Sequence, residues 1–205
     1  PGWVRRVIVA DNGSRDRTAE RARAAGATVV HEPERGYGAA CQRALRELAP
    51  DPPEIVVFLD ADYSDHPAEM ERLVRGIALG EADLVVGSRV RGSADPGALT
   101  PQQRVGNAIA CGALRALYAV RYTDLGPFRA IRYTTLQRLR MRDRDYGWTV
   151  EMQLEAARIG ARYQEVPVSY RKRIGRSKIG GTLRGTLGAS RKIVSLLVRH
   201  AFEAR

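Results

Sequence analysis

Apolar residues in the first half of the chain fall into short continuous runs, separated by segments of helical periodicity. Such runs, when turn residues bound them, are typical of strands buried in a sheet. The predicted strands are residues 4–10, 28–31, 55–59 and 84–86. Helical spacing and end signals predict helices at residues 15–25, 36–49 and 67–79. This alternation favours an α/β fold with a mostly parallel sheet flanked by helices.

The second half of the chain has a looser pattern. Glycine, serine and proline at residues 91–101 predict a mobile loop, and residues 171–181 form a basic loop that also contains glycine. The remaining elements expected are a turn and short strand at 124–131, a strand at 163–170, and helices at 102–118, 147–159 and 182–202. We therefore expect one α/β domain at residues 1–181, followed by a terminal helix at 182–205.

The terminal helix is amphipathic and basic. Its apolar residues share one stripe, and its basic residues, Arg184, Arg191, Lys192 and Arg199, lie on another side. Two interpretations stay open: the helix packs on the core with a solvated basic face, or it rests on a membrane surface.

The chain has 205 residues and a formal net charge of +11, nearly all of it from arginine. That charge attracts phosphates, nucleic acid or an anionic membrane. Cys41 and Cys111 lie far apart without metal-ligand spacing, which is typical of free thiols in a reducing compartment. No apolar run is long enough to cross a membrane. We expect a cytoplasmic protein, and contact with the cytoplasmic membrane face is left open.

Two carboxylates follow the predicted strand at 55–59. Asp60 and Asp62 stand one residue apart, and Asp65 is a candidate third ligand. Mg²⁺ and Mn²⁺ prefer such oxygen ligands and share them with substrate phosphates. Ligands in open parallel sheets bind beyond the carboxyl ends of the strands. The pattern predicts a divalent-cation site here, although acidic pairs also cap helices.

A second candidate turn follows the first strand. Asp11-Asn12-Gly13-Ser14 has two interpretations: Asp11 recognises a nucleoside, or the segment is a glycine turn in which Ser14 caps a helix. His31, His66 and His200 do not cluster in sequence, which argues against a histidine metal site.

Six segments in order resemble the family 2 glycosyltransferases, which have the nucleotide-sugar-binding GT-A fold. The similarity is greatest to the polyprenyl-phosphate branch, which includes dolichol-phosphate mannose synthase. Motifs that carry the resemblance include VVFLDADYSDHP, LVVGSR and TDLGPFRAI. The matching segments are residues 7–22, 34–45, 56–67, 84–89, 123–131 and 147–179.

The resemblance implies a role for each matching position. Asp11 contacts the nucleoside, and Asp60 with Asp62 binds the metal that holds the donor diphosphate. Arg89 and Arg129 hold phosphates. A loop of Arg176, Ser177 and Lys178 closes over the donor. Asp62, Arg129 and Arg176 are the residues expected to act in catalysis, since bound cations stabilise the charge of a departing diphosphate. For each arginine, a solvated surface charge is the alternative.

The resemblance also implies a reaction, the inverting transfer of a sugar from a GDP- or UDP-linked donor to a polyprenyl phosphate. An alternative acceptor is a hydroxyl of a soluble compound or glycan, which would need a base such as Asp124 or Glu151. Glu165 is expected to be structural. A non-catalytic nucleotide- or nucleic-acid-binding module is the third alternative, although an aromatic-basic stacking surface is missing from the sequence.

Two departures from the family pattern affect these expectations. The chain opens where the family's second strand is due, so we expect the usual first strand and helix to be absent. The segment after Asp62 is one residue longer than in the branch most similar to this chain. The assignment of Asp65 as third metal ligand depends on that spacing.

Overall fold

The computed structural model describes residues 2–174 and 194–200. The chain divides into two compact units. Unit 1 consists of Pro1–Pro53 and Arg142–Trp148, and unit 2 of Glu54–Met141 and Thr149–Arg205. The predicted boundary at residue 181 lies outside the described residues.

Unit 1 contains a two-stranded parallel sheet and two helices. Strand β1 (Ile8–Asp11) pairs with β2 (Thr28–His31), with Ile8 opposite Thr28. The helices are α1 (Thr18–Ala24) and α2 (Tyr37–Leu48). Helix α1 begins later than predicted because the Asp16 carboxylate accepts the amide of Thr18, at 3.0 Å, and so forms a local turn.

The start of α2 depends on a close approach of two backbone segments. The amides of Gly38 and Ala39 donate to the carbonyl oxygens of Asp145 and Arg144, at 3.2 and 2.8 Å. Gly36 has a φ of 151°, and a Cβ there would lie 2.0 Å from the Arg144 carbonyl oxygen. Only glycine fits this position. The contact explains why residues 142–148 belong to unit 1.

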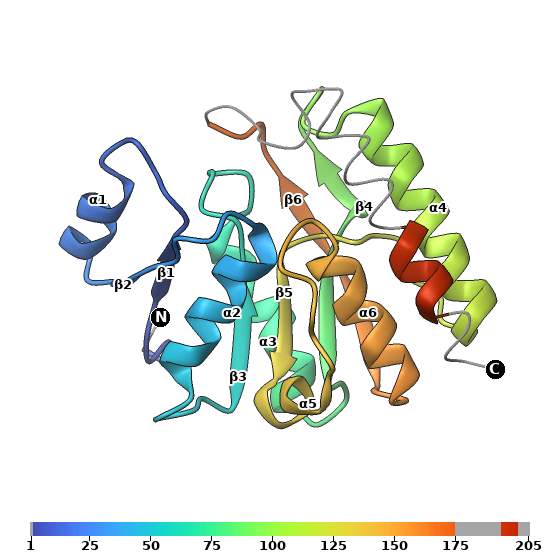
Figure 1. The fold of residues 1–205 in the computed structure, drawn as a ribbon. Helices are drawn as coiled ribbons and strands as arrows, with labels where there is room; N and C mark the ends of the chain where they lie inside the picture. The colour runs from blue at the N-terminus through green and yellow to red at the C-terminus, as the bar shows by residue number, and fades with distance from the viewer. Residues whose placement is uncertain (1, 175–193, 201–205) are drawn as a thin grey trace. The chain divides into compact units, whose positions relative to one another are not determined.

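Unit 2 is built on a four-stranded sheet in the order β3-β5-β4-β6 (Figure 1). Strands β3 (Ile55–Phe58), β4 (Leu84–Ala94) and β6 (Tyr163–Tyr170) run in one direction, and β5 (Arg129–Arg132) runs against them. This is the mostly parallel sheet that the sequence predicts. Its helical segments are η1 (Pro67–Glu69), α3 (Met70–Ala78), α4 (Pro101–Tyr118), α5 (Tyr133–Arg138) and α6 (Trp148–Arg158).

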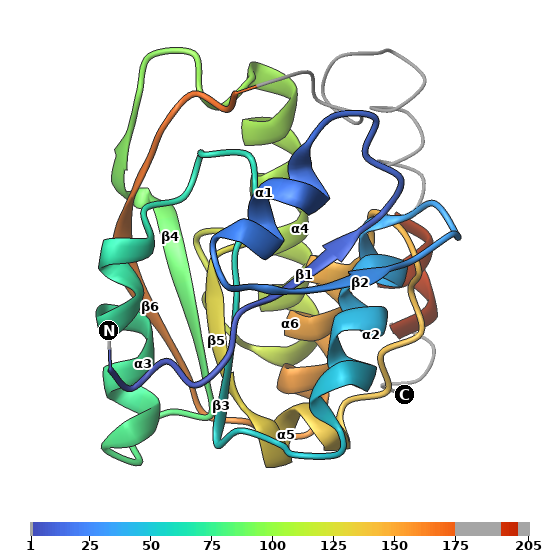
Figure 2. The same ribbon diagram turned by 90° about the vertical axis from the view of Figure 1, so that its left-hand side faces the viewer.

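Helices cover both faces of this sheet (Figure 2): α3 lies on one side, and α4 and α6 lie on the other. Leu73 and Ile77 of α3 pack with Val85, Phe128 and Val168 in a core whose members are at most 1% exposed. Helix α6 is buried from Val150 to Ala156, which explains why its sequence shows little amphipathic pattern.

Strand β4 is longer than predicted. Its first five residues are buried, as the apolar run indicates, but the strand continues through the expected loop to Ala94. After an irregularity between Ser88 and Ser93, it pairs again with β6 at Ser93 and Ala94. Gly92 permits this pairing, because a Cβ there would lie 2.0 Å from the Val168 carbonyl oxygen. Sequence periodicity cannot reveal such an exposed extension.

Helix α4 carries clear end signals. Thr100 and Gln103 form a reciprocal capping box, Pro101 occupies the first turn, and Ala119 ends the helix in the left-handed conformation with a φ of 57°. Of the predicted terminal helix, only residues 194–200 are described, and these are helical. Among the described residues, no helix has the length and apolar character needed to cross a membrane.

Candidate donor, metal and acceptor site

The Asp60-Ala61-Asp62 segment follows β3 in unit 2, with Leu59 between the strand and Asp60. Both carboxylates are half-buried. Asp65 is 2% exposed, and its Oδ2 accepts the Asp60 amide at 3.0 Å. Ser64 is fully buried, and its amide donates to Asp62 Oδ1 at 3.0 Å. Asp65 and Ser64 therefore fold the loop that presents Asp60 and Asp62.

Burial dominates the electrostatics of Asp65. Desolvation raises the pKa of this carboxyl to about 7; the Asp60 amide opposes the shift, whereas the Asp60 and Asp62 carboxylates add to it. Its Oδ1 is buried and has no hydrogen-bond partner among the described residues. Asp65 thus supports the turn through one oxygen, and its expected role as third metal ligand stays a prediction.

The acidic loop fits a cation that is bound together with a diphosphate. In the described part of the chain, no three histidine, cysteine or carboxylate side chains are grouped to hold a metal ion. Mg²⁺ and Mn²⁺ are often held by one or two carboxylates and completed by substrate phosphates and water. Asp60 and Asp62 would supply that number of protein ligands, and their role as metal ligands stays a prediction.

Arg89, at the end of the buried part of β4, is paired with Asp124. Its Nε and Nη2 donate to the two carboxylate oxygens at 2.8 and 2.7 Å, and its amide donates to Oδ2 at 2.7 Å. The guanidinium also lies over the Tyr170 ring, 5.0 Å from its centroid. The Asp124 side chain is 1% exposed and that of Arg89 13%. Although burial opposes the charge, the Asp124 contacts hold the pKa of Arg89 above its ordinary value.

The loop carrying Asp124 is fixed from several sides. Glu165 Oε1 accepts the amides of Thr123 and Asp124, at 2.8 and 3.1 Å, as a structural residue would. Asn107 of α4 donates to the Thr123 carbonyl and accepts the Leu125 amide, both at 2.8 Å. A Cβ at Gly126 would lie 2.5 Å from the Gly87 carbonyl oxygen, so only glycine allows the loop to approach β4 this closely.

Arg129 occupies a different environment from the one that the resemblance implies. It is 1% exposed, and its guanidinium donates to the carbonyl oxygens of Leu125, Gly126 and Thr149. These contacts bind backbone carbonyls rather than an exposed anion. Arg129 thus holds the loop after Asp124 in place, and its expected phosphate-binding and catalytic role stays a prediction.

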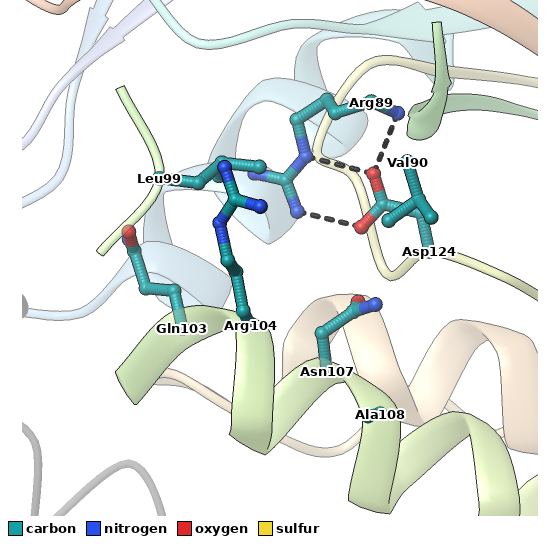
Figure 3. Close-up of a pocket in the computed structure, with 8 residues that line it drawn as sticks. All are labelled: Arg89, Val90, Leu99, Gln103, Arg104, Asn107, Ala108 and Asp124. Carbon is teal, nitrogen blue, oxygen red and sulfur yellow. Dashed lines mark hydrogen bonds and ion pairs between the residues drawn. The ribbon is translucent and has the colours of Figure 1, made fainter. Parts of the chain in front are cut away.

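A cavity of about 220 Å³ lies beside the Arg89–Asp124 pair. Figure 3 shows Arg104 and Asn107 rising from α4 toward that pair, with Leu99 beside Arg104. The lining combines cationic and amide groups with apolar side chains: Arg89, Val90, Leu99, Gln103, Arg104, Asn107, Ala108 and Asp124. The cavity can accept an anion joined to an apolar group.

Sequence reasoning missed Arg104, although its position was informative. It lies in the first turn of the helix that follows β4, on the carboxyl side of that strand, where ligands of α/β folds bind. Glu151, the other candidate base, is fully buried and paired with Arg199 at 2.9 Å.

In unit 1, Asp11 ends β1 and builds the turn after it. Its Oδ1 accepts the Ser14 amide at 2.9 Å, and its Oδ2 lies 3.7 Å from His31 Nδ1. The hydrogen bonds from Ser14 lower the pKa of Asp11, so the carboxylate is ionised near neutral pH. The predicted glycine turn is therefore present, but Ser14 does not cap α1. Arg176, Ser177 and Lys178 lie outside the described residues.

Comparison with known proteins identifies the family. Residues 4–150 match the family model "Glycosyl transferase family 2". An uncharacterized glycosyltransferase of Mycobacterium tuberculosis is 38% identical over 89% of this chain and 81% of its own length. The undecaprenyl-phosphate mannosyltransferase of Micrococcus luteus is 33% identical over 87% of this chain and 77% of its own.

Solved structures show the same architecture. Glucosyl-3-phosphoglycerate synthase from Mycobacterium tuberculosis, in complex with phosphoglyceric acid, is similar with a TM-score of 0.74 and 27% identity. The match covers 97% of this chain and 70% of that one. The same enzyme is also solved with Mn²⁺ and UDP-glucose. The fold is thus that of the GT-A glycosyltransferases, and the chain belongs to glycosyltransferase family 2.

Proposed function

We propose that this glycosyltransferase moves a hexose from a nucleotide-sugar to a polyprenyl phosphate, with inversion at the anomeric carbon. The cavity beside Arg89 carries the proposal, because it joins cationic groups to an apolar wall. A polyprenyl phosphate has the same two parts, a phosphate and a hydrocarbon chain.

On the donor side, Asp60 and Asp62 would hold a divalent cation together with the donor diphosphate. When bound, the cation supplies Lewis-acid stabilisation of the negative charge that gathers on the departing nucleoside diphosphate. Complexes of glucosyl-3-phosphoglycerate synthase with Mn²⁺ and UDP-glucose support this assignment, and either Mn²⁺ or Mg²⁺ suits the oxygen ligands. We keep Asp11 as the nucleoside contact and Arg176, Ser177 and Lys178 as the donor-closing residues that the family resemblance implies.

On the acceptor side, Arg89 and Arg104 would bind the acceptor phosphate. Arg89 is already fixed by Asp124, so its charge is positioned before the ligand arrives. Val90, Leu99 and Ala108 offer apolar contacts to the first part of a hydrocarbon chain.

The candidate bases also favour a phosphate acceptor. An alcohol must lose a proton as it attacks, whereas a phosphate monoester is already an anion near neutral pH. Asp124 is held by Arg89, and Glu151 by Arg199, so both carboxylates are neutralised by arginine partners. Neither is well placed to accept a proton.

The outer face of α4 suits a membrane-borne acceptor. Val105 and Ile109 are each 59% exposed, on the helix that also carries Arg104. Exposed apolar residues on a helix that also carries basic side chains favour contact with an anionic bilayer. We propose that the protein works at the cytoplasmic face of a membrane. The undecaprenyl-phosphate mannosyltransferase of Micrococcus luteus and the dolichyl-phosphate hexose transferase of Haloferax volcanii support this reading.

A hydroxyl acceptor is the second candidate. It is favoured by the similarity to glucosyl-3-phosphoglycerate synthase, which is solved with phosphoglyceric acid. That compound also carries a phosphate, so Arg89 and Arg104 would serve either acceptor.

An assay of product formation with the purified chain distinguishes the polyprenyl phosphate acceptor from the hydroxyl acceptor. UDP-glucose and GDP-mannose are each offered with undecaprenyl phosphate in detergent, with phosphoglyceric acid, or with no acceptor, in the presence of Mn²⁺. We expect a glycolipid that mild acid cleaves, because a sugar linked to a phosphate is acid-labile. Transfer to phosphoglyceric acid, without any glycolipid, would move the chain to the second candidate.

A further inference from the structure

The end of β6 and the residues after it are hydrogen-bonded to the acidic loop of unit 2, residues 60–65. Tyr170 forms an isolated bridge with Asp65, and the Arg171 amide donates to the Ser64 carbonyl at 2.9 Å. The Ile174 amide donates to the Asp62 carbonyl at 2.8 Å. The backbone of residues 170–174 therefore follows the loop that carries Asp60 and Asp62.

Arg173 forms an ion pair with the carboxylate of Asp62. Its Nη2 lies 3.0 Å from Asp62 Oδ2, while Ser64 donates its amide and its hydroxyl to Oδ1. Both oxygens of Asp62 therefore have partners within the protein. The side chains of Arg173 and Asp62 are 33% and 22% exposed, so the ion pair is partly shielded from water.

The neighbouring arginine fixes the shape of the same loop. Arg171 donates to the Asp65 carbonyl at 2.7 Å, and its guanidinium lies 3.6 Å above the Tyr63 ring. Tyr63 has a φ of 74°, a left-handed conformation that is unfavourable for a bulky residue. The segment that supplies Arg173 thus also holds a strained turn beside Asp62.

A divalent cation and the Arg173 guanidinium compete for Asp62 Oδ2, because two positive charges repel each other at such short separation. Cation binding is therefore weakened while Arg173 stays in place, and it is strengthened when Arg173 moves to another anion or to water. A donor diphosphate provides that anion at the same place. When a cation binds alone, the free energy lost with the Arg173–Asp62 ion pair weakens its binding. When the diphosphate binds as well, its new contact with Arg173 offsets that loss.

We propose that Arg173 is a resident counter-ion of Asp62, which suppresses binding of a bare divalent cation and couples cation binding to the diphosphate. Arg173 leaves Asp62 when both ligands arrive and pairs with the diphosphate. The site is thereby protected from occupation by a cation without donor. The inference rests on the proposed metal role of Asp60 and Asp62.

Binding of Mn²⁺ to the full chain, followed by the electron paramagnetic resonance signal of the free ion, tests the proposal without any turnover. The titration is done with and without UDP, for wild type, Arg173→Ala and Arg173→Lys. In Arg173→Ala, Mn²⁺ alone should bind about tenfold more tightly than in wild type, a coupling of ordinary size. The factor by which UDP strengthens Mn²⁺ binding should fall by a similar amount, and Arg173→Lys should restore much of it.

Lys172→Ala is the matched control. It removes the same charge one residue away. The backbone amide of Lys172, which the substitution keeps, donates to Asp95. It should therefore leave both Mn²⁺ affinities near those of wild type. Unchanged Mn²⁺ affinity in Arg173→Ala, while UDP still strengthens Mn²⁺ binding, would overturn the counter-ion role and leave the metal site standing. Mn²⁺ that binds to no variant, even with UDP, would instead remove the metal site on which the inference rests.

Discussion

The Arg89 guanidinium makes a two-point contact with the Asp124 carboxylate, Nε to Oδ2 at 2.8 Å and Nη2 to Oδ1 at 2.7 Å. The contact orients a cation at the wall of the cavity, and it neutralises a carboxylate that sequence reasoning considered as a base. Two planar groups joined at two points have one preferred orientation. The pair is therefore a positioning device for Arg89.

Loss of one member should destabilise unit 2. Asp124→Asn leaves the Arg89 charge without its partner, and breaking a buried pair from one side costs about 3–5 kcal/mol. Urea denaturation of the full chain measures the change. Glu54→Gln is the matched control, because Glu54 pairs with Arg132 while its side chain is 72% exposed. Equal stabilities of the two variants would contradict the structural role of Asp124.

Arg129→Ala should lower stability more than it weakens nucleotide binding. The change leaves the carbonyls of Leu125, Gly126 and Thr149 without a donor that they have in this structure. Each buried group left unsatisfied costs about 1–3 kcal/mol. Thermal denaturation measures the change in stability, and calorimetry with Mn²⁺ and UDP measures the change in nucleotide affinity. Wild-type stability combined with strongly weakened UDP binding would instead favour the phosphate-binding role that the family resemblance implies.

Arg104→Ala should act on the acceptor alone. Arg104 lines the cavity beside Arg89, so its removal should raise the KM for the acceptor phosphate about 10- to 100-fold, the range expected for a lost charge contact. The dissociation constant of UDP with Mn²⁺ should stay within about twofold. Arg115→Ala, three turns along α4, serves as the charge-matched control. A parallel loss of donor binding in Arg104→Ala would show that the cavity belongs to the donor.

The stability of unit 2 should depend on pH through Asp83. Hydrogen bonds from Arg162 lower the pKa of Asp83 below its ordinary value of 3.8, against the opposing effect of burial. A carboxylate with a lowered folded pKa stabilises the fold above its unfolded pKa, and that contribution disappears as pH falls through the folded pKa. Asp83→Asn should therefore be less stable than wild type at pH 7, and this difference should shrink as the pH falls through the folded pKa of Asp83. Glu81→Gln should show the same pH dependence of stability as wild type. If Asp83→Asn is less stable than wild type by the same amount at neutral and at acid pH, the dependence does not come from Asp83.

Much of the fold could be predicted because its signals are local. Strand β3 was predicted from one apolar run, and the helix predicted at residues 102–118 is α4, which begins one residue earlier. The extension of β4 to Ala94 could not be predicted, since an exposed strand without alternation has no periodic signal. Helix α5 was missed for a similar reason, because its six residues are too few to show a helical period.

The candidate site, too, could be predicted from the sequence only in part. Asp60 and Asp62 could be proposed as a cation site because they directly follow the apolar run at residues 55–59. The environment of Arg129 could not, because a buried guanidinium that holds three carbonyls and an exposed one that holds a phosphate look alike in sequence. The pairs Arg89–Asp124 and Arg173–Asp62 join residues far apart in the chain, and only the fold brings them together.

Calorimetric titration of UDP, and separately of GDP, into the full chain tests the central claim most directly, namely that Asp60 and Asp62 hold a cation together with the donor diphosphate. The titrations are run with Mn²⁺ and with a chelator, for wild type, Asp62→Ala and Asp51→Asn, the last a carboxylate whose side chain is 64% exposed. Wild type and Asp51→Asn should bind one of the nucleotides only with Mn²⁺, and Asp62→Ala should bind it at least about 100-fold more weakly, as for a lost metal ligand. Equal Mn²⁺-dependent affinity in Asp62→Ala and wild type would contradict the account.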